Sequence, residues 1–136
     1  MCNLLAVFPD RREWDLSGYT LDGLQFGFAV GLLIATADSS VSITIEAPLV
    51  LQMGTQVDLL DPEGGVLTER LLPLLHEPAS SLTAFRTGLL QVTFENGAEI
   101  RVPTGSEYES WHTSGTGDLV GIGMLGSPHE GSPWGG

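Results

Sequence analysis

Residues 90–102 read Leu-Gln-Val-Thr-Phe-Glu-Asn-Gly-Ala-Glu-Ile-Arg-Val, and this stretch decides the local fold. Apolar and polar residues alternate on both sides of Asn96-Gly97, which is typical of a β-hairpin. A two-residue turn there would place Phe94 opposite Glu99 and mix the two faces. A three-residue loop with Gly97 in the left-handed conformation, a G1 bulge, pairs Phe94 with Ala98 instead. The sequence therefore predicts the longer loop.

This register separates the side chains of the hairpin into two faces. The apolar face, which we expect to be buried, carries Leu90, Val92, Phe94, Ala98, Ile100 and Val102. The polar face carries Gln91, Thr93, Glu99 and Arg101. Because these four polar side chains point away from the core, we take them as part of a candidate interaction surface.

A second hairpin is predicted from residues 32–36 and 41–45, with residues 37–40 as its loop. Its apolar face is coherent if Thr36 pairs with Val41, and Leu32 with Ile45. Further short strands are expected at 4–8, 24–30, 49–52, 56–60, 82–86, 107–113 and 118–124. The Ser-Gly-Thr-Gly sequence at 114–117 predicts a turn between the last two.

One helix is expected over residues 68–76, with Thr68 as its N-cap and several leucines as its apolar stripe. Pro73 removes a helical hydrogen bond, so the helix should be short or kinked. The predicted fold class is α+β: mainly antiparallel β, with seven to nine short strands in a sheet or partly closed roll, and this one helix. We expect a single domain over residues 1–126, followed by a Gly/Pro-rich tail over 127–136.

The chain is strongly acidic, with 17 Asp and Glu against 5 basic residues and a formal net charge of −12. Such a charge repels phosphate backbones and excludes conventional nucleic-acid binding. It either serves solubility alone or favours a basic protein partner. Cys2 is the single cysteine, and no apolar stretch is long enough for a signal or membrane span. We therefore expect a cytoplasmic protein without a membrane partner.

No motif in the sequence predicts catalysis, a cofactor or a metal. Residues 121–126 match the Gly-x-Gly-x-x-Gly fingerprint, but Ser127-Pro128 follows where a dinucleotide site needs a helix. His76, His112 and His129 have no spacing typical of metal ligands. No nucleophile motif is present. The prediction is a protein that is not an enzyme.

The most distinctive polar and aromatic cluster is Tyr-Glu-Ser-Trp-His at residues 108–112. Exposed tyrosine and tryptophan side chains anchor many protein interfaces, so Tyr108 and Trp111 join the candidate interaction surface. The alternative is that one of these aromatics packs in the core with its polar group satisfied locally.

Three segments resemble a family of small bacterial proteins of unknown function. They are the hairpin sequence at 88–97, with its Phe-x-(Asp/Asn)-Gly end, the Tyr-Glu-x-Trp sequence at 108–111, and the glycine-containing segment at 121–134. The resemblance covers roughly residues 65–134. It implies an α+β fold and no established activity. Proteins similar to these are suspected of immunity or other binding roles.

Two functions follow as hypotheses. The first is a non-enzymatic protein-binding role, of the immunity or antitoxin kind, in which the acidic surface meets a basic partner. The alternative is a small-molecule-binding β-domain, because glycines and aromatics at residues 23–31 could line a cavity. Pairing into a homodimer is a further expectation, since a sheet must end in edge strands that need cover.

Overall fold

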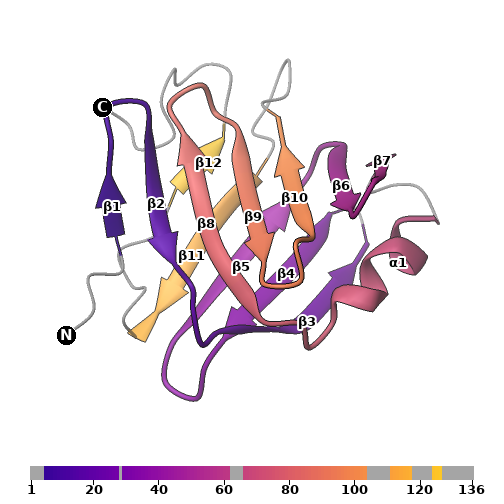
Figure 1. Cartoon of the computed structure of the whole chain (residues 1–136), viewed down its shortest axis with the longest axis horizontal. Helices are drawn as coiled ribbons and strands as arrows, with labels where there is room; N and C mark the ends of the chain where they lie inside the picture. The colour runs from indigo at the N-terminus through magenta and orange to yellow at the C-terminus, as the bar shows by residue number, and fades with distance from the viewer. Residues whose placement is uncertain (1–4, 28, 62–65, 104–110, 118–123, 127–136) are drawn as a thin grey trace.

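Two antiparallel sheets face each other in the computed structural model (Figure 1). The structure describes residues 5–27, 29–61, 66–103, 111–117 and 124–126. The seven-stranded sheet has the order β1 (Leu5–Val7), β2 (Arg11–Asp15), β8 (Ala79–Phe85), β9 (Leu90–Phe94), β10 (Glu99–Val102), β6 (Leu49–Met53), β7 (Gln56–Leu60). The five-stranded sheet has the order β12 (Met124–Gly126), β11 (Trp111–Thr116), β5 (Ser40–Ile45), β4 (Val30–Ala35), β3 (Thr20–Phe26).

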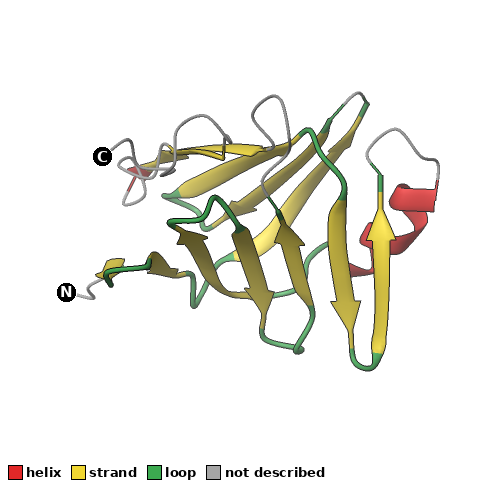
Figure 2. Ribbon diagram, turned by 90° about the horizontal axis from the view of Figure 1, so that it is seen from above, coloured by secondary structure: helices red, strands yellow, loops and turns green. Residues whose placement is uncertain are grey.

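The predicted fold class, mainly antiparallel β with one short helix, is confirmed. The expectation of a sheet or partly closed roll left the number of sheets open, and the described strands form two open sheets (Figure 2). They also exceed the predicted seven to nine. Several short elements, such as the three-residue β1 and β12, form only because a neighbouring strand pairs with them. The tail predicted over residues 127–136 lies outside the described residues.

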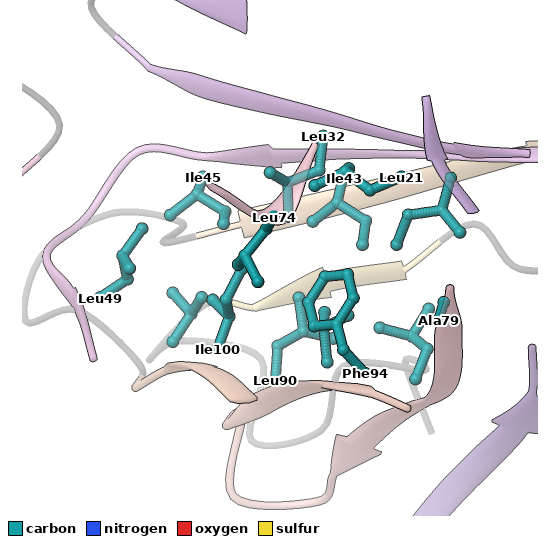
Figure 3. Close-up of a cluster of buried hydrophobic side chains, with 14 of the residues drawn as sticks. Leu21, Leu32, Ile43, Ile45, Leu49, Leu74, Ala79, Leu90, Phe94 and Ile100 are labelled. Atoms are coloured by element: carbon teal, nitrogen blue, oxygen red, sulfur yellow. The ribbon is translucent and has the colours of Figure 1, made fainter. Parts of the chain in front are cut away.

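The core lies between the inner faces of the two sheets. Figure 3 shows Ile43, Ile45 and Leu32 of the five-stranded sheet above Leu90, Phe94 and Ile100 of the seven-stranded sheet. Alternation along each strand supplies these side chains, since every second residue of a strand points to the same face. The outer faces are thereby left to the intervening residues.

The hairpin predicted over residues 90–102 is confirmed in register and in burial. Leu90 pairs with Val102 and Val92 with Ile100. The Phe94 amide donates to the Ala98 carbonyl at 2.9 Å, and Gly97 has a φ of +90°. All six apolar side chains of this hairpin are 2% exposed or less.

The second hairpin forms, but its predicted register is wrong by two residues. Ile34 pairs with Val41 rather than with Ile43, and the loop is residues 36–39. Thr36 begins the loop because its hydroxyl accepts hydrogen bonds from the amides of Asp38 and Ser39, at 3.3 and 3.1 Å. A shift of two keeps every side chain on its predicted face, so the apolar pattern does not distinguish the two registers.

The turn predicted at residues 114–117 is also wrong, because β11 continues to Thr116. β11 pairs with β5 over its whole length, with Ser114 opposite Ser42 and Thr116 opposite Ser40. The hydroxyls of Ser40 and Thr116 lie 2.8 Å apart. Strand pairing between distant segments has overridden the local turn preference of Ser-Gly-Thr-Gly.

The helix is short, as Pro73 predicts. α1 (Val66–Leu71) begins before Thr68, which is therefore not its N-cap, and passes into the 3₁₀ turn η1 (Leu72–Leu74) at the proline. Leu71 and Leu74 are fully buried in the core. α1 lies beside β7 at one end of the sandwich (Figures 1 and 2). Among the described helical residues, no segment is long and apolar enough to cross a membrane.

Candidate functional site

The four polar residues predicted on the hairpin lie together on the outer face of the seven-stranded sheet. Gln91 pairs with Arg101 and Thr93 with Glu99, and all four are half-buried. The Arg101 Nη1 atom lies 3.8 Å from Glu99 Oε2. We call these four residues the outer ladder. Because the charges of Arg101 and Glu99 cancel and the other two side chains are neutral, the outer ladder offers polar groups with little net charge.

The outer ladder continues across the next two strands into apolar side chains. Arg101 pairs with Val50, which pairs with Leu59 of β7. Leu59 is 74% exposed, although leucine is among the residues most often buried. One row along the sheet, Glu99 pairs with Gln52, which pairs with Val57, and Val57 is 56% exposed. Val50, Val57 and Leu59 therefore form an apolar patch beside the outer ladder, which we call the β7 patch.

The β7 patch lies at an edge of the sheet. β7 pairs with β6 on one side and is the last described strand on the other. An edge strand has backbone groups available to a further strand, and natural proteins commonly protect such edges with charge. On β7 the charged residue is Asp58, whose Oδ2 atom lies 3.8 Å from Arg70 Nε of α1. The outward side chains of β7 are thus apolar, and its one carboxylate is paired with the helix.

Sequence reasoning missed Val57 and Leu59, although a signal was present. Leu59 and Leu60 are adjacent in a strand, so one of them must point away from the core. The structure buries Leu60 at 5% exposure and turns Leu59 outward. Two neighbouring apolar residues at the end of a strand therefore indicate an exposed apolar position.

The opposite edge of the same sheet differs in chemistry. Val7 of β1 is 66% exposed there, but the neighbouring Phe8 ring is covered by the Arg11 guanidinium at 4.1 Å from the ring centroid. Arg11 also forms ion pairs with Asp10 at 2.8 Å and Glu13 at 3.3 Å. This edge is a charged network, whereas the β7 edge is apolar.

Trp111 does not belong to an exposed surface, and its prediction as an interface residue is corrected. Its side chain is 0% exposed, and its Nε1 atom donates a 2.8 Å hydrogen bond to the Gly88 carbonyl in the turn between β8 and β9. The alternative considered for this cluster, a core aromatic with a locally satisfied polar group, describes Trp111. Tyr108 lies outside the described residues.

An open depression of about 330 Å³ lies on the outer face of the five-stranded sheet, where residues 23–31 were predicted to line a cavity. Gly23 and Gly31 do line it. Phe26 does not, and Phe28 lies outside the described residues. The depression is open to solvent because it lies on an outer face and not between the sheets.

The described ionisable residues do not assemble into a metal site: among them, no three or more His, Cys, Asp or Glu side chains could hold an ion together. His76 is exposed after η1, whereas His112 is half-buried on β11 of the five-stranded sheet. Hydrogen bonds from the hydroxyl and backbone amide of Ser17 lower the pKa of Asp15, which is exposed. The described end of the Gly-x-Gly-x-x-Gly match is strand β12, where a dinucleotide site needs a helix.

The comparisons with known proteins identify a family but no function. A family model described as a family of unknown function (DUF6188) matches residues 13–126. Neither a curated protein nor a solved structure matches the chain. The chain therefore belongs to this family of unknown function.

Proposed function

We propose that this member of the family is a non-enzymatic binding protein that engages a basic protein partner through the β7 patch and the outer ladder. The observation that carries the proposal is the exposure of Leu59 and Val57 on one outer face, beside half-buried polar groups. Apolar residues surrounded by polar ones are typical of a protein interface. Leu59, the most exposed of the three patch residues, is expected to be its anchor.

The charge of the chain supports a partner with basic residues. The net charge is −12, and Arg11, Arg70 and Arg101 are paired with the chain's own carboxylates. An acidic protein attracts a basic partner at long range and so raises its association rate, while contact at the apolar patch sets the lifetime of the complex. A basic toxin neutralised by this chain, in an immunity or antitoxin role, is the specific form of partner we propose.

The test compares three immobilised proteins: wild type, Leu59→Lys and Val7→Lys. Val7 is the matched control because it is an exposed apolar residue, 66% against 74%, on the opposite edge strand of the same sheet. We expect one basic protein to be retained from the source lysate by wild type and Val7→Lys, and to be lost from Leu59→Lys. With purified partner, Leu59→Lys should raise Kd about thirtyfold, the effect of losing a central interface residue.

The proposal also predicts that binding weakens as salt is raised, because the long-range attraction is screened. Retention of the same proteins by all three baits would refute it, as would a partner without excess positive charge. Light scattering tests the alternative occupant, a second copy of the chain. A wild-type dimer that Leu59→Lys converts to a monomer would assign the β7 patch to a homodimer and overturn the basic-partner proposal.

A further inference from the structure

We infer that the depression on the five-stranded sheet binds an uncharged, polyhydroxylated small molecule, a carbohydrate. This site is independent of the proposed protein interface, because it lies on the outer face of the other sheet. Its volume, about 330 Å³, lies near the lower end of the range for ligand sites, so the ligand is small.

Two glycines in diagonal positions create the depression. Gly23 pairs with Leu33, and Leu33 with Ser42 on the next strand. In the following row Gly31 lies between Gln25 and Thr44. Each row of three outward positions therefore lacks one side chain, and the four side chains that remain surround the gap.

Limited space, rather than backbone conformation, favours glycine at these two positions. A Cβ atom on Gly23 would lie 3.3 Å from the Leu33 Cβ, and one on Gly31 would lie 3.2 Å from the Gln25 Cβ. Neither glycine has a positive φ. Any side chain at these positions would occupy the depression itself.

The chemistry of the lining favours a neutral ligand with hydroxyl groups. Among the outward lining residues, Gln25 supplies an amide, Ser42 and Thr44 supply hydroxyls, and Leu33 supplies an apolar surface that is 39% exposed. Amides and hydroxyls both donate and accept hydrogen bonds, as sugar hydroxyls do. Among the described residues, the nine that line the depression include no charged side chain that could pair with a phosphate, carboxylate or ammonium group.

The polar groups continue beyond the depression along β5 and β11. Ser42 pairs with Ser114, and Thr44 with His112. All four are on the outer face, where Ser42 and Ser114 are exposed and Thr44 and His112 half-buried. A ligand longer than the depression would thus meet the Ser114 hydroxyl and the His112 imidazole in the direction of β11.

The test is a titration of the isotope-labelled protein with cellobiose and, separately, maltose, followed by amide NMR. We expect saturable shifts confined to residues 23–25, 31–33 and 42–44. Thr44→Val, which removes one hydroxyl and keeps the side-chain shape, should weaken binding about fivefold, the effect of one neutral hydrogen bond. Gly31→Ala should weaken binding as well, because its methyl group fills the depression.

Gly27→Ala is the matched control, since a Cβ at Gly27 would meet no heavy atom within 4 Å and Gly27 does not line the depression. It should bind both sugars as wild type does. Absence of localised shifts with both sugars would overturn the inference. So would equal binding by wild type, Thr44→Val and Gly31→Ala, or stronger localised shifts with inorganic phosphate than with either sugar.

Discussion

Replacing Gly97 with alanine should destabilise the fold by about 1 kcal/mol, through the backbone alone. Gly97 has a φ of +90°, and a Cβ atom placed on it would meet no heavy atom within 4 Å. An added methyl group would therefore not clash with neighbouring residues. The left-handed backbone conformation itself costs about 1–2 kcal/mol for a residue with a Cβ. Alanine also restricts the unfolded chain, which offsets this cost by about 0.4–1 kcal/mol.

Gly27→Ala is the control that separates the cost of the left-handed backbone from the other effects of alanine. Gly27 also has free space around its Cβ position, but it has no positive φ. This control should stabilise the protein by about 0.5 kcal/mol through the unfolded chain. The two variants should therefore differ by about 1.5 kcal/mol, or about 0.8 M in urea midpoint at a typical m-value of about 2 kcal/mol/M. Urea unfolding followed by circular dichroism measures the difference. Equal midpoints would refute the assignment of Gly97 to a G1 bulge.

Three further predictions concern side chains. Trp111→Phe should lower the free energy of unfolding by about 2–3 kcal/mol, because it removes the buried hydrogen bond to Gly88 and leaves a cavity; a loss below about 1 kcal/mol in urea unfolding would contradict this. Leu59→Lys should change stability by less than about 0.5 kcal/mol in the same assay, since Leu59 is exposed; a larger loss would mean that Leu59 supports the fold. Hydrogen bonds from Ser17 lower the pKa of Asp15. The ionised carboxylate of Asp15 therefore stabilises the fold at pH values above the ordinary pKa of an aspartate, and this contribution is lost as the pH falls through the lowered pKa. An NMR titration should show this lowered pKa, and Ser17→Ala should raise it; an unchanged pKa would show that the hydroxyl has no effect.

The sequence predicts the hairpin of β9 and β10 completely because its turn and its apolar pattern agree. Only one loop length places all the apolar residues on one face and also gives Gly97 its positive φ. The hairpin of β4 and β5 lacks such a turn residue. In the observed register the Thr36 hydroxyl accepts hydrogen bonds from two amides of the loop, and the apolar pattern alone does not predict these bonds.

Burial of an aromatic residue depends on contacts between distant segments, and the sequence could not place Trp111 for this reason. Its strand lies beside β5, and its indole reaches a turn of the other sheet, 23 residues away in the chain. The glycines at 23 and 31 were predicted near a cavity, but their diagonal placement depends on the bulge between Leu21 and Gly23 in the pairing of β3 with β4. Local patterns thus predicted the outer ladder and the glycines of the depression but not the β7 patch, and the strand register determined which residues meet.

The arrangement of the sandwich separates the residues that hold the fold from those that carry the two candidate sites. The inner faces form one buried cluster, to which both sheets contribute. Leu59 and the hydroxyl residues of β5 lie on outer faces, where Leu59 is exposed and Thr44 is half-buried, and changes on an outer face away from the core have little effect on the free energy of unfolding. A loss of binding in Leu59→Lys or Thr44→Val can therefore be assigned to the surface itself.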